Sequence, residues 1–327
     1  MIDGGLISSE FCPGGTPATP SGGKFADPHR TAGGEPRAWV SLGRLETLWI
    51  NTGTLCNLTC ENCYIESSPK NDRLSYLTRE ELSAYLDELA SLEHGTHTIG
   101  FTGGEPFMNP DFMAMLGDTL SAGYRALVLT NAMKPMYKCR SALLALRARF
   151  PQHLVLRVSM DHFRPELHQQ ERGPRSWKPM LEGLRWLSAE GFRINVAGRT
   201  RWGDDASELR QGYQRLFDAE GIAVDARDPQ MLVLFPEMDE SAPVPEITES
   251  CWGILGVDPS EVMCASSRMV VKRKGADAPA VVACTLLPYD ERFELGPRLA
   301  DALGAVPLNH PHCARFCVLG GGSCSSS

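Results

Sequence analysis

The sequence predicts an α/β fold, in which a partial (β/α)6 TIM-like barrel is followed by a small Cys-rich α+β domain at the C-terminus. From Leu45 to about Pro236, short apolar runs alternate with amphipathic helical stretches, and Gly, Pro or Asn punctuates each of them. Alternation of this kind requires right-handed crossovers and a parallel sheet. From about Glu246 the pattern changes to irregular segments that carry cysteines. We therefore divide the chain into an N-terminal extension (1–40), the barrel (41–245) and the C-terminal domain (246–327).

Six apolar runs are the expected barrel strands, and amphipathic stretches between them are the expected helices. The strands are 45–51, 96–102, 125–130, 153–159, 193–198 and 231–235, and the helices are 78–92, 110–122, 140–150, 177–190 and 205–219. In parallel sheets, ligand chemistry lies at the carboxyl ends of the strands, so the loops that follow strands should carry the function. In the C-terminal domain, 268–274 and 279–283 predict a hairpin.

The N-terminal extension differs in composition from the rest of the chain. Residues 1 to about 37 are rich in Gly, Pro, Ser and Thr and show no apolar periodicity. We expect this segment to be flexible or loosely draped, and therefore a poor location for catalysis.

The composition of the chain indicates which partners it can bind and in which compartment it works. The 327 residues are 43% hydrophobic and carry a net charge of -8, which indicates a soluble globular protein and works against binding nucleic acid through its phosphates. No apolar stretch approaches the roughly 20 residues that span a bilayer, and the N-terminus lacks a signal-peptide pattern, so we expect a cytoplasmic protein. Eleven cysteines, an odd number in two tight clusters, favour metal ligation over disulfides.

The first cysteine cluster lies immediately after the first expected strand. It reads Cys56-Asn-Leu-Thr-Cys60-Glu-Asn-Cys63-Tyr64, which brings three thiols onto one loop. A [4Fe–4S] cluster usually takes four Cys ligands, so three local ligands leave one iron open to an outside ligand. Structural zinc sites usually pair two C-x-x-C units, and no second unit follows nearby.

With this strand context, the loop resembles the C-x3-C-x2-C hallmark of the radical S-adenosylmethionine (SAM) superfamily, and the resemblance extends over about residues 45–327. It implies that SAM chelates the open iron through its amino and carboxylate groups. A flavodoxin- or ferredoxin-type donor would reduce the cluster, and SAM would then be cleaved to methionine and a 5′-deoxyadenosyl radical that abstracts hydrogen from a substrate. Many members carry an aromatic residue just before the third Cys, whereas this chain has Asn62 there and Tyr64 after it, near the expected adenine site.

A Gly-Gly-Glu-Pro string occurs twice. Gly103, Gly104 and Glu105 follow the second expected strand, where glycines allow backbone carbonyls to approach a ligand and a carboxylate can receive an ammonium group. This matches the family motif that binds the SAM amino group. The copy that contains Glu35 lies in the extension with no strand before it, so we interpret it as a solvated turn.

Further candidates stand at later strand ends. Ser159, after the fourth strand, is expected at the SAM ribose or carboxylate, as in similar proteins. Asn131 is either a ligand or a turn cap. Arg199 offers a fork to the SAM carboxylate or forms an ion pair. The segment 159–173 resembles the S-x-D-…-H-…-R-G stretch of members with a C-terminal auxiliary-cluster domain. Its polar residues either face the substrate or have structural roles, and they are Asp161, His162, Arg164 and His168. We assign no catalytic residue.

The second cysteine cluster occupies the C-terminal domain. Two cysteines, Cys264 and Cys284, flank the expected hairpin, and Cys313 and Cys317 form a tight pair. Such a set can close around zinc or a cubane cluster. It is similar to twitch or SPASM extensions, which implies a second, auxiliary [4Fe–4S] cluster.

The remaining cysteines are Cys12, Cys139, Cys251 and Cys324. A full SPASM domain has about seven cysteines for two clusters. Six in the C-terminal domain are too few, so we favour the one-cluster twitch arrangement. We assign no role to Cys12 or Cys139, and the roles of Cys251 and Cys324 stay open.

The function that the sequence favours is reductive SAM cleavage followed by hydrogen abstraction from an unidentified substrate. The extension is too short and too rich in Gly for a peptide-recognition domain of roughly 80 residues, so a small metabolite is favoured over a peptide. One alternative is a peptide-modifying radical SAM maturase. Another is a non-catalytic iron–sulfur or zinc redox protein, against which Glu105 and Ser159 argue because a carrier needs no SAM pocket.

Overall fold

The computed structural model describes residues 23–92, 94–237 and 242–323. Its main sheet has the strand order β10-β9-β8-β2-β3-β4-β5-β6-β7, and the run from β8 to β7 is parallel throughout. The six predicted barrel strands are confirmed as β2 (Thr47–Asn51), β3 (Thr98–Thr102), β4 (Arg125–Thr130), β5 (Leu154–Ser159), β6 (Arg193–Arg199) and β7 (Leu232–Phe235). The fold is therefore α/β with a mostly parallel sheet, as a partial TIM-like barrel requires.

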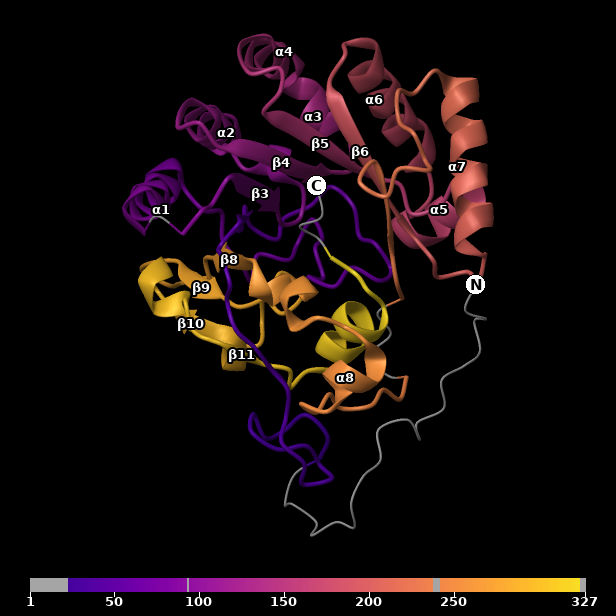
Figure 1. Ribbon diagram of the computed structural model, residues 1–327. Coiled ribbons are helices and arrows are strands. Elements are labelled where there is room, and N and C mark those ends of the chain that lie inside the picture. The colour runs from indigo at the N-terminus through magenta and orange to yellow at the C-terminus, as the bar shows by residue number, and fades with distance from the viewer. Residues whose placement is uncertain (1–22, 93, 238–241, 324–327) are drawn as a thin grey trace.

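Helices cover the outer face of this sheet. The five predicted helices are α1 (Arg79–Leu92), α2 (Phe112–Ser121), α4 (Arg140–Arg149), α6 (Trp177–Ala189) and α7 (Ala206–Glu220). Figure 1 shows them along one side of the strands, with the C-terminal segments, orange to yellow, on the other side. Two short helices of the barrel segment were not predicted, α3 (Lys134–Lys138) and α5 (Pro165–Arg172). Pro165 stands in the first turn of α5 and Gly173, with φ of 89°, follows its last residue, and both features fix the ends of a helix.

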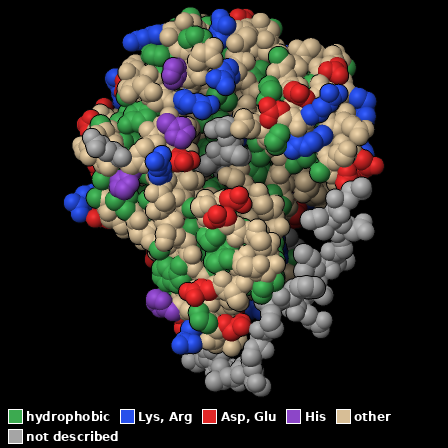
Figure 2. All heavy atoms as spheres, in the orientation of Figure 1, with side chains coloured by type: hydrophobic (Ala, Val, Ile, Leu, Met, Phe, Trp, Pro, Cys, Tyr) green, Lys and Arg blue, Asp and Glu red, His purple; other side chains and the backbone are tan. Residues whose placement is uncertain are grey.

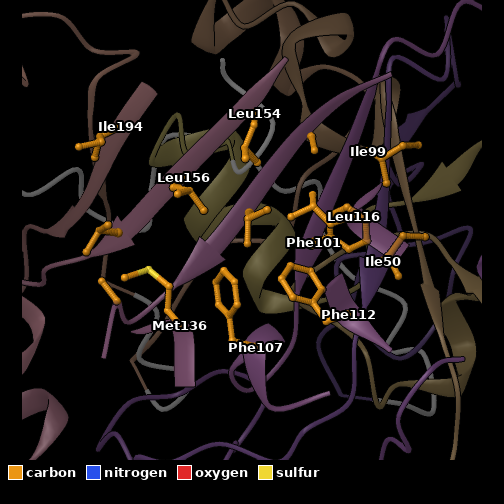
Figure 3. Packing of buried hydrophobic residues seen from close by; sticks show 14 of the residues in the cluster. Ile50, Ile99, Phe101, Phe107, Phe112, Leu116, Met136, Leu154, Leu156 and Ile194 are labelled. Atoms are coloured by element: carbon orange, nitrogen blue, oxygen red, sulfur yellow. The ribbon is translucent and has the colours of Figure 1, made fainter. Parts of the chain in front are cut away.

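The core lies between the helices and the sheet because strand side chains alternate between the two faces. Ile50, Ile99, Phe101 and Leu156 point outward and pack against helix residues such as Phe112 (Figure 3).

The Trp49 side chain lies on the inner face of the sheet. A Cβ on Gly100 of the neighbouring strand would lie 2.4 Å from the Trp49 ring, so this position excludes a larger residue. Trp49 belongs to a second apolar cluster, which includes residues of the C-terminal segments such as Met269 and Phe293. The inner face of the barrel is thus packed against the C-terminal part of the chain.

The predicted hairpin forms from β8 (Ser267–Val271) and β9 (Ala280–Val282), and β10 (Glu294–Gly296) pairs with β9. Strand β8 pairs with β2, so the hairpin extends the barrel sheet and does not build a sheet of its own. The division at 245 and 246 therefore separates two sequence segments that share one sheet. The remaining elements of this part are α8 (Cys251–Leu255), β11 (Val306–Pro307), short 3-10 turns and a π-helical segment over Cys313–Leu319.

The expectation of a loosely draped extension does not hold for residues 23–40. Arg37 is only 1% exposed, and its Nη2 lies 2.5 Å from Oε1 of Glu246. The backbone N–H of Phe25 donates to the same carboxylate, and β1 (Trp39–Val40) pairs with β11. A buried ion pair with strand pairing anchors this segment against the C-terminal part, a partnership that composition alone does not reveal. Residues 1–22, with Cys12, lie outside the described residues.

The distribution of charged side chains on the surface is relevant to the expected partners. On the face that Figure 2 shows, Lys and Arg side chains are interspersed with Asp and Glu and form no continuous basic stripe. Within the described ranges, no helix is long and apolar enough to cross a bilayer.

Candidate active site

The three cysteines of the first cluster line one pocket at the carboxyl ends of the barrel strands. The last residues of five consecutive strands also line it, namely Thr102, Thr130, Ser159, Arg199 and Phe235. The structure thus brings the cysteine loop, which follows β2, together with the loops after the neighbouring strands. This is the arrangement that the expected parallel sheet implies.

The glycine pair after β3 lies backbone to backbone against the segment that leads into Cys56. Gly104 N donates to Gly53 O at 2.8 Å, and a Cβ on Gly104 would lie 2.2 Å from Leu55 O. Gly103 has φ of 129°, a conformation that side chains disfavour. Both glycines line the pocket, so the pair fixes the cysteine loop and leaves backbone groups beside a ligand.

Glu105 lies behind the wall of the pocket. Its side chain is 1% exposed and does not line the pocket; its carboxylate accepts hydrogen bonds from Thr130 Oγ1 at 2.9 Å, Asn131 N at 2.9 Å and Phe107 N at 3.4 Å. Burial raises the pKa of Glu105 to about 7. The carboxylate therefore ties the end of β3 to the end of β4, and the pocket receives the backbone of the motif instead of its carboxylate.

Asn131 caps a turn and also stands in the wall of the pocket. Its Oδ1 accepts from Met133 N at 3.1 Å and so caps the turn, while its Nδ2 donates to Asn57 Oδ1 at 2.9 Å. It also lines the pocket. Because Asn57 is the residue after Cys56, this bond links the cysteine loop to the end of β4.

Helix α5 holds the cysteine loop through hydrogen bonds that we did not predict from the sequence, and we call this contact the clamp. Glu171, near the end of α5, has a fully buried side chain and accepts from Asn62 N at 3.0 Å and from Asn62 Nδ2 at 2.9 Å. Its backbone carbonyl accepts from Glu61 N at 2.8 Å. Asn62 lies between Cys60 and Cys63, so the clamp fixes the part of the loop that presents two of the three thiols. The only signal in the sequence was its place in the S-x-D-…-R-G stretch.

A charge network flanks the same thiols. Arg172 forks onto Asp161 and directs Nη1 toward Cys60 Sγ at 3.9 Å, while Arg199 Nε lies 3.4 Å from Asp161 Oδ1. Burial alone would raise the pKa of Asp161, but Arg172 and Arg199 hold that pKa below its usual range. Arg199 also donates to Asn62 O at 3.0 Å, so it forms the ion pairs that were its alternative role while lining the pocket.

The donor set fits a three-cysteine cluster. Three thiols from one loop face a pocket that retains room for a further ligand. Burial raises the pKa of Cys56 to about 12 and also raises that of Cys60, so these groups stay protonated unless a cation such as cluster iron lies beside them. Tyr64, next to Cys63, lines the same pocket.

The histidines of the 159–173 segment have structural positions. His162 Nδ1 accepts from Arg164 N at 2.9 Å, and its ring packs 5.2 Å from Trp202 between ring centroids. His168 is fully buried against Trp177, and burial lowers its pKa to about 4. Neither histidine lines the pocket.

The four predicted auxiliary cysteines line a second, apolar pocket together. Its walls include Leu286, which also lines the first pocket, and His312. The four cysteines are Cys264, Cys284, Cys313 and Cys317. Among the residues that the structure describes, no three His, Cys, Asp or Glu side chains come close enough to hold a single metal ion.

Two other cysteines lie outside both pockets. Cys251 is buried, and its Sγ accepts from Thr248 N at 3.4 Å. Cys139 is half-buried between α3 and α4. Cys324 lies outside the described residues.

Comparison with known proteins matches residues 50–200 to the model of the radical SAM superfamily. Among curated proteins, the chain is 30% identical over 143 residues to the antilisterial bacteriocin subtilosin biosynthesis protein AlbA of Bacillus subtilis, which is 43% of this chain and 30% of AlbA. It is 29% identical over 153 residues to the GTP 3′,8-cyclase of Tolumonas auensis, which is 46% of this chain and 43% of the cyclase. The match thus spans less than half the length of these relatives.

Solved structures agree on the fold. The structure of Streptococcus suis SuiB bound to S-adenosylmethionine has a TM-score of 0.57 at 10% identity, with 78% of this chain and 64% of SuiB covered. Native anSMEcpe with bound AdoMet has a TM-score of 0.56 at 15% identity, with 78% and 79% covered. The family match, the cysteine loop and the strand-end pocket together identify residues 50–200 as a radical SAM domain, and members of that superfamily are enzymes that bind a [4Fe–4S] cluster and SAM.

Proposed function

We propose that this chain reductively cleaves SAM at a [4Fe–4S] cluster held by Cys56, Cys60 and Cys63, and abstracts hydrogen from a substrate. The observation that carries the proposal is the convergence of these three thiols with five consecutive strand ends on one pocket. When bound, the cluster would supply an open iron for SAM and one electron for its cleavage.

The residues of the pocket would then bind and orient SAM. The backbone at Gly103 and Gly104 borders the cysteine loop and offers acceptors for an ammonium group. Ser159 and Asn131 line the pocket with polar groups suited to the ribose or carboxylate, and Arg199 brings a cation to the same wall. Glu105 acts indirectly, because it holds the ends of β3 and β4 in register.

We further propose that Cys264, Cys284, Cys313 and Cys317 hold an auxiliary [4Fe–4S] cluster in a twitch-like C-terminal domain. All four line one pocket with apolar walls, and relatives of the SPASM type carry auxiliary clusters. Four ligands would leave no open iron, which suits electron transfer; a site with one Cys released could contact the substrate directly.

The pocket favours a substrate that presents an apolar C–H group. The wall beyond the cysteine loop is formed by Leu129, Phe235 and Phe316. The arginines that line the pocket, Arg172 and Arg199, are already paired with carboxylates, which disfavours a triphosphate. We favour a small metabolite over a peptide; a peptide maturase is the alternative, since AlbA and the mycofactocin maturase MftC are among the relatives.

The cluster chemistry also indicates the cellular compartment and the electron donor. A thiol-ligated cluster needs a reducing compartment, so we propose a cytoplasmic enzyme. A flavodoxin- or ferredoxin-type protein would supply the electron.

The activity is tested by anaerobic reconstitution with iron and sulfide, reduction by dithionite, addition of SAM and detection of 5′-deoxyadenosine. We expect 5′-deoxyadenosine from the wild type and none from Cys60→Ala, with Cys139→Ala as a control that removes a thiol outside both pockets. Absence of 5′-deoxyadenosine from a reduced, fully loaded wild type would favour the non-catalytic redox protein instead.

Iron content tests the auxiliary site. A chain with two cubanes binds about eight iron atoms, and the Cys264→Ala, Cys284→Ala double variant should bind about four. An unchanged iron content would remove the second cluster from the proposal, and zinc in place of iron would identify the mononuclear alternative.

A further inference from the structure

Arg268, at the start of β8, is a buried cation surrounded by main-chain carbonyls. The residue is 1% exposed. Its Nε donates to Ala302 O at 2.8 Å, Nη1 to Cys264 O at 2.5 Å and Ser267 O at 2.8 Å, and Nη2 to Gly304 O at 2.9 Å. Within residues 23–92, 94–237 and 242–323, no carboxylate lies within ion-pair distance of this guanidinium.

Two other arginines with little exposure have a counter-ion. Arg37 pairs with Glu246 at 2.5 Å, and Arg172 forks onto Asp161. A charge that is buried without an opposite charge is strongly unfavourable, even when its hydrogen bonds are satisfied. The surroundings of Arg268 therefore call for a negative charge that the carbonyls do not supply.

The second pocket provides the place for that charge. Arg268 binds the carbonyl of Cys264, one of the four thiols of this pocket. Four thiolates around a cubane carry a net negative charge, which increases when the cluster accepts an electron.

We propose that Arg268 is the buried counter-ion of the auxiliary cluster and raises the reduction potential of that cluster. The inference rests on the proposed auxiliary site. Arg268 is a positioning residue, since its contacts are to main-chain carbonyls and it lines neither pocket.

The sign of the effect follows from electrostatics. A positive charge stabilises the reduced cluster more than the oxidised one, so its removal makes the midpoint potential more negative. For a unit charge several ångströms away in a protein interior, we expect a change of about tenfold in the equilibrium constant of reduction. This corresponds to about 59 mV for a one-electron couple.

The test uses the full chain with Cys56, Cys60 and Cys63 replaced by Ala, so that only the auxiliary cluster is present. In this background, Arg268→Gln and Arg268→Lys are compared by iron content and by a redox titration followed by electron paramagnetic resonance. Arg298→Gln is the matched control, because the side chain of Arg298 is exposed and already paired with Asp301 at 2.8 Å. We expect a potential lower by about 59 mV for Arg268→Gln, and potentials near that of the background for Arg268→Lys and Arg298→Gln.

The other outcomes are distinguishable. If the triple variant itself binds no iron, the proposed auxiliary cluster is wrong and the counter-ion role falls with it. If that variant loads iron but Arg268→Gln leaves the potential unchanged, only the counter-ion role is overturned. If Arg268→Gln binds no iron, Arg268→Lys separates the two explanations. Iron binding by Arg268→Lys at the potential of the background would support a requirement for the positive charge. Loss of iron from Arg268→Lys as well would mean that Arg268 only holds the network of main-chain carbonyls.

Discussion

Replacement of Glu171 by Gln tests whether α5 holds the cysteine loop. The change keeps the shape of the side chain but removes its charge and turns an N–H group toward a donor. Two hydrogen bonds from Asn62 to a buried carboxylate are lost or weakened, and Arg201, whose Nη1 lies 2.6 Å from Glu171 Oε2, loses its shortest ion pair. Hydrogen bonds to charged groups contribute about 1.5–3 kcal/mol each, and breaking a buried pair costs about 3–5 kcal/mol. We therefore expect the free energy of unfolding to fall by about 3 kcal/mol, which is a factor of about one hundred in the folding equilibrium.

Urea denaturation of the metal-free chain measures this loss, and iron content after reconstitution measures its effect on the loop. Glu61→Gln is the matched control, since it lies on the same loop, has a side chain that is 54% exposed and pairs with Arg201 only at 3.6 Å. Exposed pairs contribute about 0–1 kcal/mol, so this variant should unfold and load almost like the wild type. Equal stability and equal iron content in the Glu171 and Glu61 variants would refute the clamp.

Three further changes probe other contacts, each by urea denaturation of the metal-free chain. The first change is Glu105→Gln. Between pH 4.5 and about 7 the free energy of unfolding of the wild type should fall by about 3 kcal/mol relative to this variant, because the buried carboxyl is neutral in the folded chain but ionises in the unfolded chain. A difference between wild type and variant that does not change with pH would contradict this. In Gly104→Ala the new Cβ would lie 2.2 Å from a carbonyl oxygen, so the free energy of unfolding should fall by about 1–3 kcal/mol and the iron content should also fall. The control is Gly33→Ala in the duplicate motif, whose Cβ meets nothing within 3.4 Å and which should lose less than about 0.5 kcal/mol. Glu246→Gln leaves Arg37 buried without its counter-ion and should cost about 3–5 kcal/mol; wild-type stability would show that the ion pair is not needed.

The barrel could be predicted from the sequence because its signal is local. Strands such as Leu154–Ser159 are short apolar runs between clear breaks, and the helices between them repeat their apolar residues at helical spacing. Strand ends then follow from strand bounds, which is how Ser159 and Arg199 were assigned to the pocket that they line. Close spacing likewise predicted that Cys56, Cys60 and Cys63 share one loop.

Contacts between distant segments could not be predicted in this way. Glu105 was assigned to a ligand because its motif follows a strand, yet its carboxylate is used by Thr130 and Asn131, which join it only when β3 and β4 pair. Arg37 lies in a segment with the composition of a flexible tail, and its partner is 209 positions away. Composition and periodicity report on neighbours in sequence, and these partners become neighbours only in the folded chain.

The two thiol pockets are closer in the fold than their separation in sequence suggests, and this links the charge of Arg268 to the first site. Leu286 lines both pockets and follows Cys284 by two residues. Cys284 therefore stands beside the wall that separates the auxiliary site from the pocket of Cys56, Cys60 and Cys63. A substrate radical left by hydrogen abstraction in the first pocket could be oxidised by an auxiliary cluster beyond this wall, and the potential of that cluster would decide whether it accepts the electron. A lower potential in Arg268→Gln should consequently slow an oxidative turnover that sends its electron through the auxiliary site, and should leave the initial cleavage of SAM unchanged.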